Sequence, residues 1–159
     1  MKIIKLTILL FCFSLYSQSG KVIKIKDGDT IVVIDSLGNQ TTLRLAEVDC
    51  PENSQAFGNR AKQFTANEVG NKKVTYTIDS KDRYGRTIAK VFYDGKYLSK
   101  EIIKNGFGWH YKQYSISKEL AEIEVLAKKN SLGLWKEKKT TPPWEFRKQN
   151  HYSTHFGRH

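Results

Sequence analysis

The sequence predicts an α+β fold whose main element is a small closed β-barrel. Five short segments rich in Val, Ile and Thr have strand patterns, one helical segment follows the third of them, and the other helical segments follow the fifth. Five short consecutive strands with this spacing favour a Greek-key barrel of the OB type, a design that often binds oligonucleotides. The predicted fold is therefore dominated by a five-stranded OB-fold β-barrel with about three helices.

The five strand segments alternate apolar and polar residues or are continuously β-branched, as half-buried strands do. They are Lys21–Lys26, Thr30–Asp35, Thr41–Val48, Lys72–Asp79 and Thr87–Tyr93. Ser36-Leu37-Gly38-Asn39 supplies a turn between the second and third strands, and Asp94-Gly95 closes the fifth. We expect the first three strands to be consecutive and antiparallel.

The helical segments carry apolar residues at a spacing of three to four. They are Gln55–Val69, which Gly70-Asn71 ends, Tyr97–Asn105, which ends at Gly106, and Ser117–Asn130. In the last of these, Leu120, Ile123 and Ala127 share one side. Leu132–Trp135 is expected to anchor the end of the domain.

The two ends of the chain are predicted to lie outside the folded domain, residues 20–136. Residues 1–19 resemble a secretory signal peptide, with Lys2 and Lys5 before the 11-residue apolar run Leu6–Tyr16, which is too short to span a membrane. A buried N-terminal strand is the alternative. Residues 137–159 form a polar extension, in which Thr140-Thr141-Pro142-Pro143 is expected to break structure and His151–His159 to be a loose tail. The sequence therefore predicts an exported protein, extracellular or periplasmic.

The net charge predicts an anionic partner. The chain has 27 Lys and Arg against 16 Asp and Glu, a formal charge of +11, and removal of a signal peptide that ends at Ser19, or alternatively at Ser17, leaves +9. Phosphate backbones attract such a surface without regard to base sequence. Of the two cysteines, Cys12 would leave with the signal peptide, so Cys50 has no intramolecular partner.

Three short polar segments stand out as candidate sites of chemistry. They are Asp27-Gly28-Asp29-Thr30, the stretch from Arg44 to Glu52, and Asp82-Arg83-Tyr84-Gly85-Arg86. Each has an ordinary alternative: an Asp-Gly turn, a solvated acidic loop and a charged turn. Two carboxylates at the mouth of a strand are nevertheless costly without a cation.

In this order and at these intervals the three segments resemble the staphylococcal nuclease family, from about Gly20 to Trp135. The resemblance implies that Asp29 and Asp49 bind calcium together with the main-chain carbonyl of Cys50, and that Asp27 lies close to the metal. It implies that Glu52 is the general base.

The same resemblance implies that Arg44 and Arg86 bind the phosphate. Arg83 and Tyr84 correspond to residues that contact the nucleotide, and Trp109 and Tyr111 take the places of the family's pocket tyrosines. Because Trp109 and Tyr111 alternate across His110, they share a face of an extended segment, where they either stack on a base or pack on the barrel.

The implied roles agree with elementary chemistry. Carboxylates such as Asp27, Asp29 and Asp49 are hard oxygen ligands, which suit Ca²⁺ or Mg²⁺, and an exported location favours Ca²⁺. The arginines suit bidentate binding of phosphate, which lysine cannot reproduce. The chain departs from the family pattern in the short Asn53-Ser54 connection before the helix, in Cys50, where that family has threonine, and in Trp109, where it has tyrosine.

Two functions from different classes follow. The preferred one is a secreted, calcium-dependent, sugar-nonspecific endonuclease that cleaves DNA and RNA, prefers single strands, acts as a monomer and leaves 3′-phosphate ends. The other is a noncatalytic OB-fold module that binds single-stranded nucleic acid. Acids clustered at Asp29, Asp49 and Glu52 favour the enzyme, because a pure binder of polyanions gains nothing from them. A basic surface protein that binds polysaccharide or lipid headgroups leaves these acids unexplained.

Overall fold

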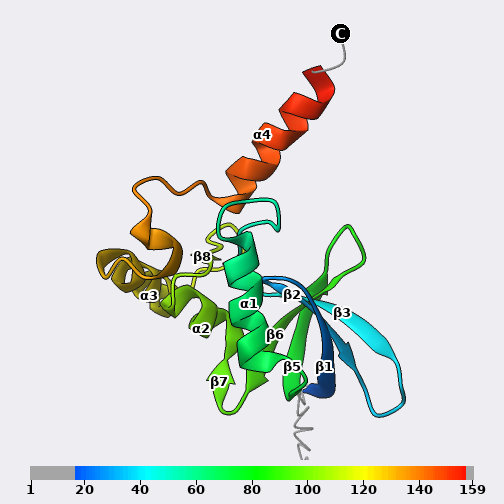
Figure 1. Ribbon diagram of the computed structural model, residues 1–159. Coiled ribbons are helices and arrows are strands. Elements are labelled where there is room, and N and C mark those ends of the chain that lie inside the picture. The colour runs from blue at the N-terminus through cyan, green and yellow to red at the C-terminus, as the bar shows by residue number, and fades with distance from the viewer. Residues whose placement is uncertain (1–16, 157–159) are drawn as a thin grey trace, which may run out of the picture.

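The computed structural model describes residues 17–156, with side chains as far as residue 150. Five strands form a barrel: β1 (Gln18–Asp27), β2 (Thr30–Ile34), β3 (Gln40–Leu45), β5 (Lys73–Lys81) and β6 (Thr87–Tyr93). Neighbours pair antiparallel in the order β3-β2-β1-β5-β6, and β6 pairs in parallel with β3, which closes the barrel (Figure 1). The predicted five-stranded barrel is confirmed.

Shorter elements and helices surround the barrel. A two-residue strand β4 (Val48–Asp49) pairs with β8 (Trp109–His110), and β7 (Lys96–Tyr97) extends the main sheet beyond β6. The helices are α1 (Gly58–Val69), α2 (Leu98–Lys104), α3 (Lys118–Lys129), a 3-10 helix (Gly133–Lys136) and α4 (Pro143–Phe156). Within the described residues, none of these helices has the length and apolarity that crossing a membrane requires.

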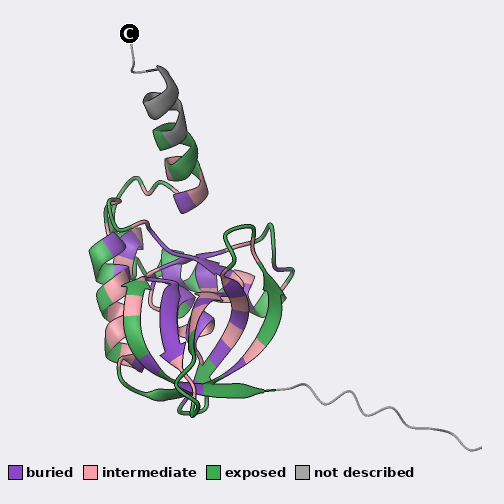
Figure 2. Ribbon diagram, turned by 90° about the vertical axis from the view of Figure 1, so that its right-hand side faces the viewer, coloured by how far each residue is buried: buried purple, intermediate pink, exposed green. Residues whose placement is uncertain are grey.

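The core fills the barrel interior. Buried side chains alternate with more exposed ones along β6, whereas β2 is buried along nearly its whole length; Figure 2 shows both kinds of strand. The largest fully buried side chains of the strands are Val22, Ile31, Val33, Leu43, Leu45 and Val48. Leu98, Ile102 and Ile103 of α2 and Leu120 of α3 belong to the same cluster. The barrel therefore gives the loops at its rim a rigid support.

Helix α1 packs tightly against the turn between β1 and β2. The Thr65 hydroxyl donates to the carbonyl oxygen of Gly28 at 2.6 Å. A Cβ added to Gly28 would lie 2.8 Å from the Cβ atoms of both Ala61 and Cys50, so only glycine fits this close approach. The position of Asp29, the next residue, is thereby fixed relative to Cys50.

Several predicted boundaries differ from the structure, the first strand, for example, beginning at Gln18 rather than Lys21, and two of the differences bear on the candidate site. The third strand ends at Leu45 rather than Val48, because Glu47 adopts a left-handed conformation (φ 66°) and the chain turns before β4. The first helix begins at Gly58 rather than Gln55, because Phe57 before it is also left-handed (φ 67°). Both differences lie in the loops that carry Asp49 and Glu52.

Thr140, Thr141 and Pro142 lie outside any helix or strand, as expected, but residues 143–156 form helix α4, so the expectation of a loose tail was wrong for residues 151–156. Proline at the first helical position is compatible with a helix, because its missing N–H has no intrahelical partner there. Figure 1 shows the first turn of α4 against the body of the molecule and the rest projecting away. Residues 157–159 lie outside the described part.

The predicted signal peptide falls almost wholly on residues 1–16, outside the described residues. Strand β1 begins at Gln18, which pairs with Tyr76, and Ser19 pairs with Thr75. Cleavage after Ser17 leaves this strand intact, whereas cleavage after Ser19 removes two of its paired residues.

Candidate active site

Asp29, Arg44 and Asp49 come together at one end of the barrel. Asp29 stands at the start of β2, Arg44 in β3 and Asp49 in β4. Nη2 of Arg44 lies 3.2 Å from Oδ2 of Asp29 and donates to Oδ1 of Asp49 at 2.8 Å. The two carboxylates are therefore on either side of one nitrogen atom. The Asp27 carboxylate accepts from the Asp29 backbone N–H at 3.1 Å, which places Asp27 beside them.

Burial makes these charges interdependent. Asp29 is 5% exposed and Asp49 1% exposed. Burial raises the pKa of the Asp29 carboxyl to about 8; Arg44 opposes this shift, while Asp27 and Asp49 add to it. For Arg44, burial lowers the pKa, but Asp29 and Asp49 raise it by more, so the guanidinium stays charged. A further positive charge near Asp29 would favour its ionised form.

Cys50 contributes its backbone to this arrangement. Its N–H donates to Oδ2 of Asp29 at 2.6 Å. The thiol is free and buried, and burial raises its pKa well above the usual value, so it stays protonated. The side chain therefore acts as a small apolar group.

Glu52 lies on the loop between β4 and α1. Its backbone N–H donates to the Gln55 side-chain oxygen at 3.2 Å, and its carbonyl accepts from the Gln55 backbone N–H at 2.8 Å. A Cβ on Gly58 would lie 1.9 Å from the Glu52 carbonyl oxygen, so the helix start packs directly on this loop. Oε1 of Glu52 accepts from Arg147 at 2.8 Å.

Arg147 of α4 binds two of the candidate site residues at once. Its Nη2 donates to Oδ2 of Asp49 at 2.8 Å, and its Nη1 lies 2.8 Å from Glu52 and 3.3 Å from Oδ1 of Asp49. Partial burial lowers the pKa of Arg147, but the hydrogen bonds to Asp49 and Glu52 raise this pKa by more than burial lowers it. The guanidinium therefore remains charged. The sequence prediction did not include Arg147.

The second predicted phosphate-binding residue, Arg86, lies in a different contact group. Its Nε donates to Oδ2 of Asp82 at 2.7 Å, and Oδ1 of Asp82 accepts from the backbone N–H groups of Tyr84 and Arg86. The guanidinium groups of Arg83 and Arg86 lie 4.9 and 5.7 Å from the centre of the Tyr84 ring. Asp82 thus organises the loop between β5 and β6. The described contacts do not join this loop to Asp49 or Glu52.

Strand pairing nevertheless relates Arg86 to Arg44. Arg44 of β3 pairs with Ile88 of β6 in parallel register. Arg86 lies just before β6, two residues ahead of Ile88, so the strand period of two places it on the same side as Arg44. Both arginines can therefore approach one substrate from that face.

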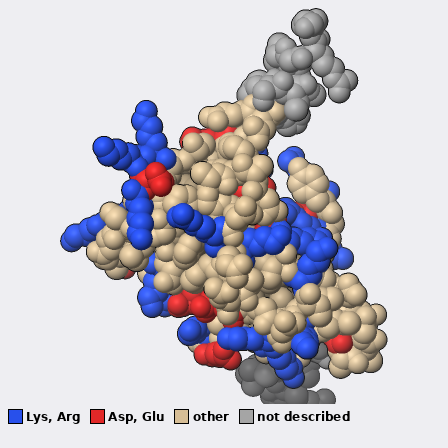
Figure 3. Space-filling model, in the orientation of Figure 1, with Lys and Arg blue, Asp and Glu red and all other residues tan. Residues whose placement is uncertain are grey.

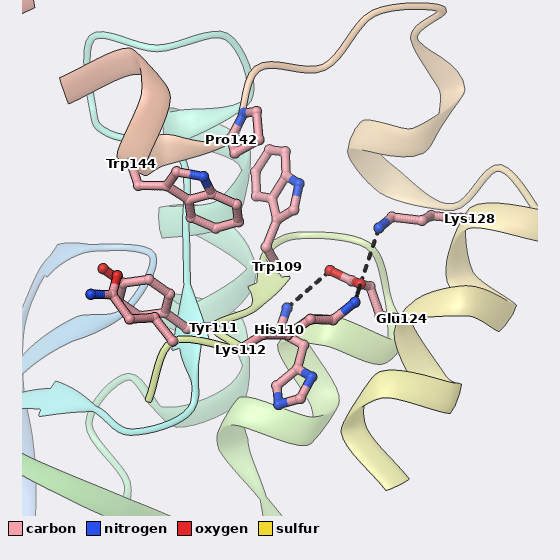
Figure 4. A pocket seen from close by; sticks show the side chains of 9 residues that line it. Trp109, His110, Tyr111, Lys112, Glu124, Lys128, Pro142 and Trp144 are labelled. Atoms are coloured by element: carbon pink, nitrogen blue, oxygen red, sulfur yellow. Dashed lines mark hydrogen bonds and ion pairs between the residues drawn. The ribbon is translucent and has the colours of Figure 1, made fainter. Parts of the chain in front are cut away.

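Trp109 and Tyr111, the two predicted pocket residues, both contact other aromatic rings. Trp109 is 5% exposed and meets Trp135 edge-on with a centroid distance of 5.2 Å, so it packs on the domain. The Tyr111 ring stacks on Trp144, with a centroid distance of 5.7 Å and an interplanar angle of 6°. Trp109 also meets Trp144 of α4 edge-on, so Trp144 joins the two residues into one aromatic group (Figure 4).

A pocket of about 330 Å³ opens beside these rings. The indole and phenol rings and Pro142 form its apolar wall, as Figure 4 shows. Glu124, 2% exposed, forms ion pairs with Lys112 and Lys128 at 3.5 and 3.0 Å on the opposite side. An aromatic wall next to lysines suits a planar, negatively charged ligand such as a nucleotide.

The donor set fits a hard divalent cation. In the described part of the chain no three His, Cys, Asp or Glu side chains form a ready metal-binding group. Asp29 and Asp49 converge nonetheless, and they offer only oxygen donors. Burial is the largest cause of the raised pKa of Asp29, and a bound cation would lower that pKa as Arg44 does.

Sequence reasoning included Asp82 in a candidate segment without giving it a role, and it missed Gln55, Arg147 and the part of Trp144 in the pocket wall. Trp144 and Arg147 are three residues apart, a spacing that puts both on one side of a helix. Had the sequence analysis placed a helix start at Pro143, it would have predicted that Trp144 and Arg147 lie on the same side of that helix.

Similarity to known proteins covers most of the chain. Residues 42–137, more than half of the chain, match the family described as staphylococcal nuclease homologue. The chain belongs to the staphylococcal nuclease family. The matched region contains Arg44, Asp49, Glu52 and Arg86, whereas Trp144 and Arg147 lie beyond its end.

Several curated relatives of the staphylococcal nuclease family resemble most of the chain. An "Uncharacterized endonuclease" of Haemophilus influenzae is 36% identical over 152 residues, which cover 92% of this chain and 85% of the relative. A "Micrococcal nuclease" of Shigella flexneri is 34% identical over 148 residues, covering 85% and 83%. The "Staphylococcal-like nuclease CAN1" of Arabidopsis thaliana is 32% identical over 112 residues, covering 70% of this chain and 35% of the plant protein.

Proposed function

We propose that this protein is an exported, calcium-dependent endonuclease that hydrolyses phosphodiester bonds of DNA and RNA and leaves 3′-phosphate ends. Membership of the staphylococcal nuclease family, with relatives named as nucleases, supports an endonuclease. The observation that carries the proposal is the convergence of Asp29 and Asp49 on one Arg44 nitrogen with Glu52 nearby.

The residues of the site have distinct roles in this proposal. Asp29, Asp49 and the Cys50 carbonyl would hold calcium, with Asp27 beside them. When bound, calcium supplies positive charge that offsets the carboxylates and attracts the scissile phosphate. Arg44 and Arg86 bind phosphate oxygens and stabilise the charge that builds up during attack.

Glu52 is the proposed general base. It removes a proton from a water molecule whose oxygen attacks phosphorus in line with the 5′-oxygen. The bond from phosphorus to the 5′-oxygen breaks, the 5′-oxygen takes up a proton, and the phosphate remains on the 3′-oxygen. General-base catalysis typically contributes about 10²–10⁴-fold to the rate.

The substrate class follows from the surface and the aromatic pocket. The chain carries a formal charge of +11, and Lys and Arg dominate the charged side chains of the face in Figure 3. Such a surface binds phosphate backbones without base specificity. Arg83, Tyr84 and Tyr111 are the proposed nucleotide contacts, and Trp109 packs edge-on against Trp144, on which the Tyr111 ring stacks. Single strands are the preferred substrate, because unpaired bases are free to stack.

Digestion with and without calcium tests the proposal. Purified protein is incubated with single-stranded DNA in millimolar calcium and, in parallel, with excess chelator. We expect hydrolysis only with calcium, and products that a polymerase extends only after phosphatase treatment removes the 3′-phosphate. Undiminished digestion in chelator would remove the cation from the mechanism. Tight binding without hydrolysis would favour the noncatalytic module.

A further inference from the structure

Arg147 joins the candidate base to a candidate cation ligand. One nitrogen of its guanidinium donates to Asp49 and the other to Glu52, both at 2.8 Å. A guanidinium is planar and presents its donors in a fixed fork, so it sets the relative position of the groups it binds. We propose that Arg147 is a positioning residue of the active site, which holds the Glu52 carboxylate beside Asp49. This inference depends on the proposed role of Glu52 as base.

Glu52 needs such a partner because of its location. It lies on a loop, and its side chain is 38% exposed, whereas the side chain of Asp49 is 1% exposed. An exposed glutamate on a loop samples several rotamers, and only some of them point at the attacking water. The ion pair uses Oε1 of Glu52, so Oε2 stays outside it and can accept the proton.

Helix α4 is itself held in place by contacts other than Arg147. Trp144 stacks on Tyr111 and meets Trp109 edge-on, with centroid distances of 5.7 and 6.4 Å. Arg147 follows Trp144 by three residues and thus leaves the helix on the same side. The aromatic contacts therefore aim Arg147 at the two carboxylates.

A second connection ties the Glu52 loop to the segment before α4. The Gln55 side-chain amide donates to the Thr141 carbonyl at 2.5 Å, and its oxygen accepts from the Glu52 backbone N–H at 3.2 Å. The C-terminal segment, which lies beyond the family-matched residues 42–137, thus contacts the loop through backbone and side chain. These contacts hold the loop that carries the proposed base in a fixed position.

The charges are compatible with a cation in the same site. Asp27, Asp29, Asp49 and Glu52 face Arg44 and Arg147. When all four carboxylates and both guanidinium groups are ionised, their net charge is −2, which one divalent cation would neutralise. The net charge of the site therefore does not require Arg147 to leave when a divalent cation binds.

Two other roles for Arg147 make different predictions. As a phosphate contact it would have to give up both ion pairs, because both of its terminal nitrogens point at carboxylates. As an inhibitory plug it would have to leave before Glu52 could act. Its removal would weaken substrate binding in the first case and raise activity in the second.

A double-mutant cycle distinguishes these roles. The variants are Arg147→Gln, Arg147→Lys, Glu52→Gln and the Arg147→Gln/Glu52→Gln pair, with Lys148→Gln as a control that removes the same charge from the next residue of α4. Initial rates over a range of single-stranded DNA concentrations give kcat and KM. DNA affinity is measured separately in chelator, and thermal melting verifies that each variant is folded.

For a positioning residue, Arg147→Gln lowers kcat by at least about tenfold and leaves KM and DNA affinity within about threefold. Arg147→Lys restores only part of the kcat lost in Arg147→Gln, because its single ammonium group cannot bind both carboxylates as the guanidinium does. In the Glu52→Gln background, Arg147→Gln changes kcat by less than about twofold. Lys148→Gln behaves like the wild type.

Three results would overturn the inference: wild-type or higher kcat in Arg147→Gln, a loss carried by KM and affinity, or the same fold loss with and without Glu52. The test separates this inference from the proposed function. If Glu52→Gln alone retains wild-type activity, the assignment of the base fails. If Glu52→Gln is inactive and Arg147→Gln is fully active, only the positioning role fails.

Discussion

Arg44 binds Asp49 through Nη2 at 2.8 Å, while its Nη1 donates to the backbone carbonyls of Leu45 and Val48 at 2.8 and 2.9 Å. One side chain thus connects the end of β3, the turn after it and the start of β4. Nη2 also lies 3.2 Å from Asp29. The guanidinium therefore fixes the backbone of the loop as well as the charges on it.

Arg44→Lys should impair both stability and activity, although it keeps the positive charge. A lysine has one nitrogen and cannot reach two carbonyls and two carboxylates in the same geometry. Loss of the two carbonyl contacts costs about 1 kcal/mol each. Urea unfolding should show a decrease of about 2 kcal/mol or more, and DNA hydrolysis should fall severely. Arg60→Lys, on the exposed side of α1, is the control; equal behaviour of the two variants would show that the fork geometry of Arg44 is unimportant.

The sequence predicted the barrel well because strand patterns are local. The fifth strand, Thr87–Tyr93, has the predicted bounds, since its alternation is unbroken and Asp94-Gly95 follows it. Predictions failed where backbone conformation depends on contacts from elsewhere. Glu47 turns the chain before β4. The carbonyl of Ala46 beside it is bound by Ser99, 53 residues away, which no local pattern reveals.

The site residues that lie in short polar segments of the sequence could be predicted from it. Asp29, Asp49 and Arg44 converge as expected. Asp29 directly precedes Thr30, which pairs with Arg44, and Asp49 follows the short turn after β3. Arg147 was not predicted, because it reaches the site from 98 residues beyond Asp49 on a helix whose proline start looked like a break. The calcium ligands, the base and the phosphate contacts remain predictions for experiment.

Glu52→Gln should reduce turnover by at least about a hundredfold, because an amide cannot accept the proton of the attacking water. DNA binding should be retained, since Glu52 is not a phosphate contact. Single-turnover rates and DNA affinity are the measurements, with Glu122→Gln on the exposed face of α3 as a matched control. Wild-type turnover in Glu52→Gln would place the base elsewhere.

Gly58→Ala should slow the reaction by moving the Glu52 loop. The new Cβ would lie 1.9 Å from the Glu52 carbonyl oxygen, so loop or helix must shift. Alanine favours helix by about 1 kcal/mol over glycine, but overpacking typically costs about 1–3 kcal/mol. We expect a lower free energy of unfolding and a lower kcat. Asn59→Ala, one residue further along α1 and exposed, should affect neither; an active, more stable Gly58→Ala protein would show that the loop tolerates the displacement.

The stability of the protein should fall in acid because of His110. Its Nε2 lies 2.9 Å from the Ser115 hydroxyl, which itself donates to Glu47. Nε2 therefore carries the hydrogen, and Nδ1 has no hydrogen-bond partner within the described residues. A proton added at Nδ1 would be buried without an acceptor. Burial accordingly lowers the His110 pKa, and Lys112 lowers it further, against the opposing effect of Glu124 and Glu47.

The sign of the pH effect follows from linkage. As the pH falls through about 6.5, histidine in the unfolded chain binds a proton that folded His110 does not, so acid favours unfolding. The free energy of unfolding should therefore decrease below about pH 6.5, by up to about 1.4 kcal/mol per pH unit from this group. Urea unfolding of wild type and His110→Gln between pH 5 and 8 isolates the effect, because the other histidines are common to both. The stability difference between the two proteins should shrink as the pH falls; a constant or growing difference would mean that His110 is protonated in the folded protein.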